Sequence, residues 1–572
     1  MKEWRVYSKK ADFESISRRF GIDQVVARII RNRNVEGMEA IDRYLNGSIS
    51  DMYDPGLMKD MDKAADILLT CIKEKRKIRI IGDYDIDGIC SIYILFKGLL
   101  FLGADVDYEV PDRIADGYGI NEKLILEAYN AGRDVILTCD NGIAAVSQIE
   151  YAKSLGMTVI ITDHHDIRYE VIDDEKKYLI PCADAVVNPK QEDCKYPFKN
   201  LCGAGVAYKL IQHLNNKSGV DSDNVERYLE FAAIATVGDV VDLQDENRII
   251  VKSGLNKIKN TSNPGLSALI ELTGINRNDI TSYHIGFVIG PCLNASGRLD
   301  TAKRAIKMLL TDNKCEAERL AGDLKSLNDE RKTLTLKATE SAIEQIEGTM
   351  MNDRVLVVFL PDCHESIAGI VAGRIRERYY KPAIVLTRVE DGVKGSARSI
   401  ESYNIFEKLL ECEHLLTKFG GHPLAAGLSL KEADVDTLRK ELNDRCGLSE
   451  EDLTEKIWID VPMPLYYISE KVINDMACLE PFGKGNEKPV FADKNISIIN
   501  IQKIGKNGQF TKMQLEDKCG CLMEAMLFMD CPDLFDAYIN KNKISCTYYP
   551  EINEFRGNKK LQICVTGYKI EK

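Results

Sequence analysis

Residues 80–88 read Ile-Ile-Gly-Asp-Tyr-Asp-Ile-Asp-Gly, and the rest of the chain is organised around this stretch. The run that leads into it, 77–81, has the apolar composition of a short buried strand. Three carboxylates follow at alternate positions: Asp83, Asp85 and Asp87. Carboxylates at the carboxyl end of a strand repel one another, and they lie where open α/β sheets bind ligands. A divalent metal ion is the simplest charge that offsets this repulsion. A solvated acidic turn is the alternative for this stretch taken alone.

The length and the charge of the chain limit its class. With 572 residues, it is too long for a single core and should divide into roughly three or four domains. A hydrophobic content of 45% and a charged content of 29% are ordinary for a globular protein. The net charge of −13 argues against a protein that coats nucleic acid non-specifically. It leaves room for a local basic groove, because the distribution of charge matters more than its sum.

Targeting signals and paired cysteines are missing from the sequence. We find no apolar run of about 18 residues that would cross a membrane, and the first residues lack the apolar core of a signal peptide. The 17 cysteines are odd in number and have no Cys-x-x-Cys spacing. We therefore expect reduced cysteines, a cytoplasmic protein and no membrane partner.

Alternating strand-like and helix-like runs from about 75 to 245 predict a mostly parallel sheet with right-handed crossovers. The strand-like runs are 78–81, 106–110, 135–138, 158–161 and 185–187. Helix-like runs at 121–131 and 144–155 lie between them. The predicted fold class is therefore α/β.

We expect four segments along the chain. Residues 1–315 would form the parallel-sheet domain, together with a polar helical segment at its start. A charged helix at 316–346, which would span roughly 45 Å, would join it to a second α/β domain at 347–452. Residues 453–572 are rich in strands with Gly and Asn turns, which predicts a small β-barrel.

Acidic residues and histidines follow the other predicted strands as well. They are Asp112, then Asp140 with Asn141 and Gly142, then Asp163 with His164 and His165, and later Asp239 and Asp242. Because parallel strands end at one edge of their sheet, we expect these groups to converge. Oxygen ligands with one or two imidazoles suit Mn²⁺ or Mg²⁺, whereas a zinc site would more often use thiolates. For the histidine pair alone, one packed and one solvated ring is the alternative.

Four of these motifs, in this order, resemble the signature of the DHH phosphoesterase family. They are residues 82–88, 140–142, 163–165 and 238–239. Further motifs resemble the RecJ branch of that family, the single-strand-specific 5′→3′ exonucleases of bacteria. They are residues 110–113, 116–119, 294–298, 396–398, 420–423, 479–486 and 553–558. The resemblance covers nearly the whole chain and implies a DHH-associated domain at about 350–450, followed by an oligonucleotide-binding (OB) barrel. The sequence stops before a further C-terminal domain that some of these proteins carry.

The resemblance implies two metal ions, Mn²⁺ or Mg²⁺. Their ligands would be Asp83, Asp85, Asp140, His164 and Asp239, with Asp140 bridging the ions. Two ions can activate a water and stabilise the leaving oxygen of a displacement at phosphorus. Asp87 is either a further ligand or the cap of the helix that follows. Many family members have a histidine where this chain has Ile81, which leaves one ion with one ligand fewer.

By the same resemblance, other residues would act on the substrate. His165 would face the scissile phosphate, and Asp163 would orient the histidines. The groups that would bind a 5′-phosphate across a cleft between the two domains are Arg113, Ser396 and Arg398. The groups that would hold the next phosphates are Arg298, Gly420, Gly421 and His422. A narrow cleft would reject duplex DNA.

Charged and aromatic residues of the barrel would contact the strand by charge and stacking. They are Phe510, Lys512, Phe555 and Arg556, with Lys503, Lys506, Lys559 and Lys560 nearby. An ordinary barrel with solvated lysines is the alternative, since no fixed spacing identifies any of these residues as a base contact.

The sequence thus predicts a metal-dependent 5′→3′ exonuclease that degrades single-stranded DNA to nucleoside 5′-monophosphates in DNA repair and recombination. Two alternatives stay open. A phosphodiesterase for short oligonucleotides or cyclic dinucleotides would generally lack a barrel such as 455–572, and a non-catalytic DHH scaffold would have lost the metal ligands. The resemblance suggests a single-strand-binding protein and a RecQ-type helicase as partners, although no residue tells whether either delivers the substrate. We expect a monomer.

Overall fold

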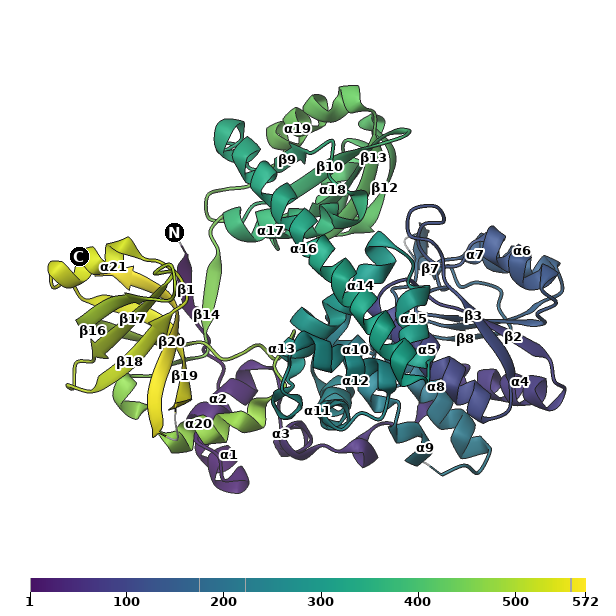
Figure 1. Ribbon diagram of the computed structural model, residues 1–572, viewed down its shortest axis with the longest axis horizontal. Coiled ribbons are helices and arrows are strands. Elements are labelled where there is room, and N and C mark those ends of the chain that lie inside the picture. Colours follow the sequence, from purple (N-terminus) through teal and green to yellow (C-terminus); the bar gives the residue numbers. More distant parts are fainter. Residues whose placement is uncertain (1, 174, 222, 556–557, 572) are drawn as a thin grey trace.

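The computed structural model describes residues 2–173, 175–221, 223–555 and 558–571. A parallel-sheet domain, a second α/β domain and a barrel are arranged around the centre of the molecule (Figure 1). The long helix α16 (Lys314–Thr349) runs from the first domain to the second, and the Asn313 side chain caps its start by accepting from the Glu316 amide. In the described part of the chain, no helix is both long and apolar enough to span a membrane.

The first sheet has five parallel strands in the order β3-β2-β4-β5-β8. They are β2 (Lys77–Ile81), β3 (Asp105–Glu109), β4 (Val135–Cys139), β5 (Thr158–Thr162) and β8 (Ala185–Val187). Helices α4 (Met61–Lys73), α5 (Ile86–Phe101) and α8 (Gly203–Lys217) share one core cluster with the sheet, and α6 (Glu122–Asn130) and α7 (Val146–Ser154) share another. Because both faces are buried, the inner strands read as continuous apolar runs. The predicted parallel α/β sheet is confirmed.

A helical region completes the first domain. It contains α9 (Asp223–Glu226), α10 (Leu229–Gly238), α11 (Asp245–Lys259), α12 (Pro264–Thr273), α13 (Ser282–His284), the π turn η4 (Ile285–Ile289), α14 (Gly290–Leu299) and α15 (Lys303–Leu310). Two further strands, β6 (Tyr169–Ile172) and β7 (Glu175–Tyr178), pair antiparallel in a separate two-stranded sheet.

The second domain is a mixed five-stranded sheet in the order β12-β13-β11-β10-β9. Its strands are β9 (Leu356–Phe359), β10 (Ala383–Val389), β11 (Gly392–Arg398), β12 (Leu416–His422) and β13 (Ala425–Leu430). Its helices are α17 (Glu365–Tyr379), α18 (Ile405–Leu410) and α19 (Val435–Asp444). The end of α16 packs with α17 through Ala342 and Ile346, so the connecting helix is part of this domain's core.

The C-terminal part is a closed barrel, as the sequence predicted. Its five strands are β16 (Phe491–Ile504), β17 (Phe510–Glu516), β18 (Leu522–Leu527), β19 (Ile544–Phe555) and β20 (Asn558–Ile570). The pairing of β16 with β19 closes the barrel, and β15 (Val461–Pro462) extends it. Helices α20 (Glu470–Met476) and α21 (Pro532–Ile539) cover its ends.

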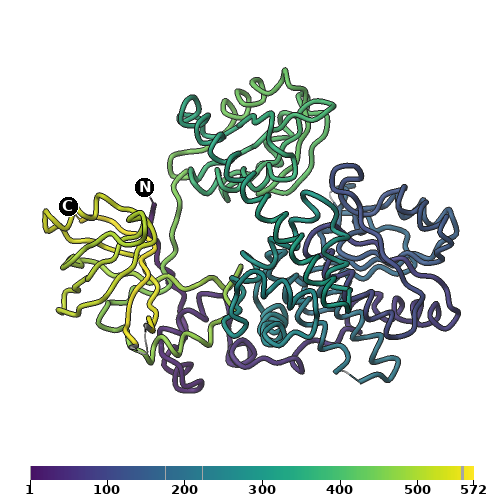
Figure 2. Tube along the Cα trace, in the orientation of Figure 1, coloured from purple at the N-terminus to yellow at the C-terminus, as the bar shows by residue number. Residues whose placement is uncertain are grey.

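The N-terminal segment buries its apolar faces against the barrel, whereas we assigned it to the parallel-sheet domain, which it meets through polar contacts between α3 (Met38–Asn46) and α11. Strand β1 (Glu3–Val6) pairs in parallel with β14 (Lys456–Ile459). Helices α1 (Phe13–Phe20), α2 (Gln24–Asn32) and α3 bury their apolar faces in the barrel's core cluster. Figure 2 shows both chain ends beside the barrel. An amphipathic helix reveals which face it buries, but not which partner covers that face.

A buried ion pair fastens this segment to the barrel. Arg33 and Asp460 are each 5% exposed, and their two hydrogen bonds measure 2.7 and 3.1 Å. The Asn32 side chain also donates to Asp460. Removing one member of such a pair leaves the other charge buried without compensation.

We expect Asp460→Ala to destabilise the barrel and its N-terminal helices by about 3 kcal/mol, because buried Arg33 would lose its two charge-assisted hydrogen bonds and keep only the longer ion pair with Glu487 at 3.9 Å. Urea unfolding followed by tryptophan fluorescence measures this, since Trp4 and Trp458 lie in the paired strands β1 and β14. Glu14→Ala, which breaks the exposed pair with Arg18, is the control and should cost only about 0.3–0.5 kcal/mol. Equal losses for the two variants would contradict the prediction.

Candidate metal centre and phosphate-binding cleft

The end of β4 turns sharply at Asp140. This residue has a left-handed backbone with φ 59°, a conformation that aspartate tolerates better than most residues. The Asn141 amide donates to the carbonyls of Ile81 and Cys139, which ties the ends of β2 and β4 together. Gly142 follows at φ 113°, where a Cβ would lie 2.6 Å from the Thr138 hydroxyl. The motif therefore aims the Asp140 carboxylate along the sheet edge.

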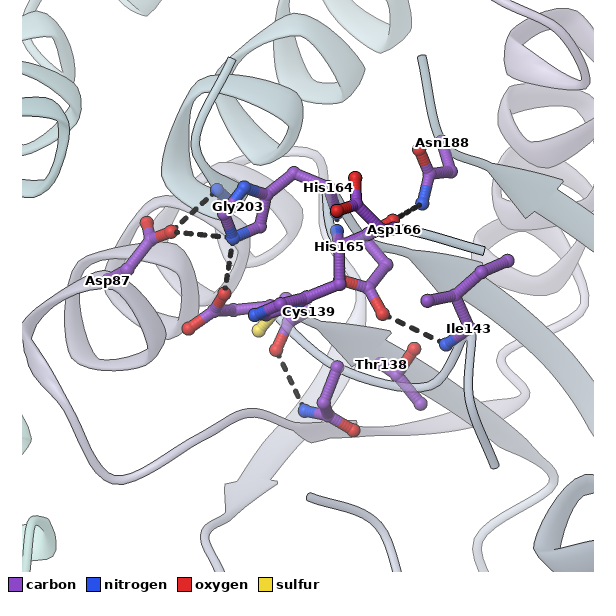
Figure 3. Close-up of polar contacts among 12 residues, drawn as sticks. Asp87, Thr138, Cys139, Ile143, His164, His165, Asp166, Asn188 and Gly203 are labelled. Atoms are coloured by element: carbon purple, nitrogen blue, oxygen red, sulfur yellow. Dashed lines mark hydrogen bonds and ion pairs between the residues drawn. The ribbon is translucent and has the colours of Figure 1, made fainter. Parts of the chain in front are cut away.

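The three acids after β2 have different partners. Asp85 caps α5, because its carboxylate accepts from the amides of Asp87 and Gly88. Asp87 is fully buried and accepts from the Gly203 amide at 2.6 Å, at the start of α8 (Figure 3), and from the Ala204 amide at 2.7 Å. Of the two roles that the sequence left open for Asp87, the cap of the helix that follows is wrong, because Asp85 occupies that position and Asp87 accepts from a helix more than a hundred residues away.

Asp163, at the end of β5, holds the following two residues. One carboxylate oxygen accepts from both backbone amides, of His164 and His165, and from the His165 ring at 2.8 Å. The other oxygen accepts from the Ile143 amide (Figure 3). Burial alone would raise the pKa of Asp163, but the hydrogen bond and charge of His165 lower it to about 2. Burial opposes the charged form of His165 too, yet Asp163 raises the pKa of its ring to about 9.

His164 faces three carboxylates. Its Nε2 atom lies 3.1 Å from Asp140, 3.5 Å from Asp87 and 3.8 Å from Asp239, which follows α10. Burial and the neighbouring His165 lower the pKa of His164 to about 3, so the ring is neutral at physiological pH. A neutral imidazole is the form that binds metal ions.

Three sets of side chains bring their ligand atoms within 4.8 Å of one another. They are Asp83 with Asp85 and Asp140, Asp87 with His164 and Asp239, and Asp140 with His164 and His165. All five predicted metal ligands thus lie close together, and Asp87 and His165 belong to the same cluster.

The electrostatics of this cluster favour a bound cation. Burial, reinforced by the other carboxylates, raises the pKa of Asp140 well above its usual range and that of Asp239 to about 8. One oxygen of Asp83 is buried and accepts no hydrogen bond from the described residues. A divalent cation would neutralise the acids and coordinate that oxygen, so the residues fit the Mn²⁺ or Mg²⁺ predicted from the sequence.

Some acids at the sheet edge stay outside the cluster. Asp112 accepts from the amides of Ile114 and Ala115 and organises its own loop, so it does not converge with the others as we expected. Asp242 lies 3.5 Å from Lys484. Ile81 is buried in the core and supplies no ligand.

Sequence reasoning gave no role to Tyr118, which the structure places in the site. Its hydroxyl donates to the Asp140 carbonyl at 2.9 Å and lies 3.2 Å from the outer nitrogen of His165. Tyr118 lies in the quoted motif 116–119, but a single tyrosine in a glycine-rich loop carries no recognisable chemical signal.

Arginines from both domains gather beside the acids. Burial and the positive charges of Arg113 and Arg331 lower the pKa of Arg298 to about 10. Burial and Arg113 also lower the pKa of Arg398, at the end of β11. Gly369 of α17 lies against Arg398 and Ser396, since a Cβ there would meet both side chains at 3.0–3.4 Å. Among the described residues, no carboxylate forms an ion pair with Arg113, Arg298 or Arg398. Their guanidinium groups can therefore bind an anion such as a phosphate.

The other predicted substrate contacts lie farther along the second sheet and in the barrel. Gly420, Gly421 and His422 are exposed in β12, an edge strand. Phe510 packs edge-on against Phe528, and Lys512 is paired with Glu524 at 3.1 Å. Nothing is described of the Phe555 side chain, and Arg556 lies outside the described residues.

Three family models match the chain in the order of its domains. The DHH family N-terminal domain matches residues 77–236, the DHHA1 domain matches 352–447 and the RecJ OB domain matches 459–567. The single-stranded-DNA-specific exonuclease RecJ of Bacillus subtilis is 37% identical over 98% of this chain and 70% of its own length. The protein of the same name from Haemophilus influenzae is 33% identical, over 94% and 95%.

Two solved RecJ structures resemble the fold of this chain. The crystal structure of RecJ in complex with Mn²⁺ from Thermus thermophilus superposes with a TM-score of 0.84 at 25% identity, covering 100% of this chain and 80% of that one. A structure of exonuclease RecJ bound to manganese is 31% identical, with a TM-score of 0.60 over 69% and 96% of the two chains.

We expect Asp163→Asn to lower the pKa of His165 from about 9 to near or below its ordinary value, because the amide keeps the hydrogen bond geometry but removes the charge. An NMR titration of the histidine ring protons in metal-free protein measures this shift. Glu170→Gln, in the exposed hairpin strand β6, is the control. If His165 titrates alike in all three proteins, Asp163 is not the group that charges it.

Proposed function

The chain belongs to the RecJ family of DHH proteins, and on that premise we propose that it is a metal-dependent exonuclease specific for single-stranded DNA. The observation that carries the proposal is the buried cluster of acids and histidines facing arginines without carboxylate partners. A phosphodiester bound between the two would have its reacting phosphorus at the acids and its neighbouring phosphates at the arginines.

The metal would be Mn²⁺ or Mg²⁺, and we propose two ions. Asp83, Asp85 and Asp140 would hold one, and His164 and Asp239 the other, with Asp140 shared. Asp87 lies in one group with His164 and Asp239, but two helix amides already donate to its oxygens. When bound, such a pair supplies an activated water and Lewis-acid stabilisation of the leaving oxygen.

The chain's own groups would complete the chemistry. Asp163 binds the inner ring nitrogen of His165, which leaves the outer nitrogen on the side of Tyr118. A charged His165 held in this orientation can donate a hydrogen bond or a proton to the scissile phosphate. Tyr118 supports that orientation from the opposite side.

The arginine cleft would set the direction of degradation. We propose that Arg113, Ser396 and Arg398 bind a 5′-phosphate, and that Arg298 and residues 420–422 hold the phosphates that follow. Gly420 lies in open space, so a phosphate can approach the backbone of this edge strand. With the 5′ end fixed beside the metal cluster, cleavage proceeds 5′→3′ and releases nucleoside 5′-monophosphates.

The cellular setting follows from the family and stays a prediction. All 17 cysteines are free, in keeping with the reducing cytoplasm. Single-stranded DNA is the substrate that DNA repair and recombination generate. We still expect the protein to be a monomer. We also expect a single-strand-binding protein and a RecQ-type helicase as its partners.

Two other functions fit less well. A phosphodiesterase for short oligonucleotides or cyclic dinucleotides has no use for a barrel that shares a core with the N-terminal helices. A non-catalytic scaffold would not need a complete set of converging acids and histidines.

Asp140→Ala should abolish Mn²⁺-dependent shortening of a 5′-phosphorylated, 3′-labelled single strand, by at least about 100-fold, because it removes the carboxylate shared by the two ligand sets. Calorimetry should show weaker Mn²⁺ binding. Asp166→Ala is the control, since this neighbouring acid pairs with Lys190 outside the cluster. Normal Mn²⁺ binding by the Asp140 variant would refute the metal assignment, and an inactive wild type with Mn²⁺ bound would refute the exonuclease.

Arg398→Ala should slow degradation of 5′-phosphorylated DNA by about 10- to 100-fold, because charge-assisted hydrogen bonds to the terminal phosphate are lost. The preference for a 5′-phosphate over a 5′-hydroxyl should disappear with it. Arg388→Ala, on the neighbouring strand β10 and paired with Glu432, is the matched control. An unchanged preference in the Arg398 variant would place the 5′-phosphate elsewhere.

A further inference from the structure

Tyr84 lies inside the acidic motif that follows β2, but its side chain has no part in the proposed metal centre or phosphate-binding cleft. Its neighbours Asp83 and Asp85 belong to one set of converging metal ligands. The Tyr84 ring is partly buried against the core of the first domain. Its hydroxyl forms no hydrogen bond with the described residues, so any contribution of this side chain comes from the ring.

The guanidinium of Arg113 lies over the Tyr84 ring. The Cζ atom of Arg113 is 4.8 Å from the ring centroid. A cation in this position is attracted by the negative face of the aromatic ring. Among the described residues, the ring is the one partner that the guanidinium has, since it forms no hydrogen bond or ion pair with any of them.

The segment that carries the ring is held firmly in place. The Tyr84 carbonyl packs so closely against Gly297 of α14 that a Cβ at that glycine would collide with it. The Ile86 amide donates to the Asn294 side chain of the same helix at 2.8 Å. Asp85, next in the chain, caps α5. The ring is therefore presented by a rigid turn that also carries metal-ligating acids.

Arg113 has acids nearby that could capture it. A pocket of about 300 Å³ has Arg113, Asp112 and Asp300 in its lining. An unrestrained guanidinium would be attracted to these carboxylates, and an arginine paired with an acid has fewer hydrogen bonds to offer a phosphate. In the structure Arg113 pairs with neither acid, and Asp300 pairs with Arg304 instead. The Tyr84 ring thus holds Arg113 away from competing partners.

Repulsion among the arginines also acts on Arg113. Burial is the main cause of the lowered pKa of Arg298 and of Arg398, and the positive charge of Arg113 is the next cause for both. The three guanidinium groups are therefore close enough to repel one another. Attraction to the Tyr84 ring opposes this repulsion and keeps Arg113 in the cleft.

We propose that Tyr84 is a positioning residue whose ring holds Arg113 in the cleft and so ties the 5′-phosphate clamp to the metal-binding turn. This inference rests on the proposed function, in which Arg113 binds the terminal phosphate, and adds how that arginine is placed. Because one turn carries the ring and two metal ligands, the clamp keeps a fixed position relative to the metal cluster.

The test separates the face of the ring from its volume. Tyr84→Phe keeps the aromatic face and loses only the hydroxyl, whereas Tyr84→Leu keeps apolar packing without an aromatic face. We measure kcat/KM on single-stranded DNA with Mn²⁺, as the ratio for a 5′-phosphate over a 5′-hydroxyl. Tyr84→Leu should lower this ratio about tenfold, and Tyr84→Phe should retain it.

Two further variants calibrate this test. Arg113→Ala shows how far the ratio falls when the guanidinium is absent. Phe101→Leu is the matched control, because it removes the ring that lies 5.0 Å from Arg227 at the other end of α5. The control should leave the ratio unchanged.

A binding measurement makes the same comparison without catalysis. Single strands with a 3′ fluorophore and either a 5′-phosphate or a 5′-hydroxyl are titrated with metal-free protein, and fluorescence anisotropy gives the ratio of their Kd values. Tyr84→Leu should lose this ratio as Arg113→Ala does, and Tyr84→Phe should match the wild type. Calorimetry should show unchanged Mn²⁺ affinity in Tyr84→Leu. Weaker Mn²⁺ binding would overturn the inference, because the ring would then support the metal-binding turn and not Arg113.

The outcomes distinguish this inference from the proposed function. If Arg113→Ala loses the preference for a 5′-phosphate and Tyr84→Leu keeps it, the role of Tyr84 is overturned and the clamp stands. An equal loss in Tyr84→Phe and Tyr84→Leu also overturns it, since the aromatic face would not be the group that matters. If the wild type has no preference, or Arg113→Ala retains it, the clamp is overturned and the role of Tyr84 with it.

Discussion

Carboxylates buried together at one edge of a parallel sheet are the constraint on which the rest of the structure depends. Asp83, Asp87 and Asp140 are at most 3% exposed, and their mutual repulsion and burial oppose ionisation. The fold offsets part of this cost with helix amides, since Asp85 accepts from the start of α5 and Asp87 from the start of α8. The helix amides do not offset all of the repulsion among the carboxylates, and a bound cation would neutralise the rest. The cluster therefore has the properties of a metal centre and not of a solvated turn.

The second constraint is positive charge that, among the described residues, forms no ion pair with a carboxylate. Arg298 belongs to the first domain and Arg398 to the second, and burial together with the positive charge of Arg113 lowers the pKa of both. Their repulsion is tolerated because α16 holds both domains in place through contacts at each end. A cleft of this kind gains stability when an anion enters, because the anion neutralises charge supplied by both domains.

Much of the site could be predicted from the sequence. The five strands and the acids and histidines at their ends were found because β–α alternation and strand-end position are local signals. Asp163 and His165 lie where the motif predicted, and the metal ligands converge. Asp87 could not be assigned, because its helix partner at Gly203 is distant in sequence. Tyr118 was missed because its role depends on two contacts made only in the folded state.

The sequence by itself determined the fold class, the order of the domains and the chemistry at the sheet edge, since these follow from residue types at fixed spacing. The tertiary structure decided what the N-terminal helices cover, which lysines of the barrel are paired with acids, and which aromatic ring lies beneath Arg113. Periodicity shows that a helix has a face to bury, but the partner of that face is chosen by packing among segments hundreds of residues apart.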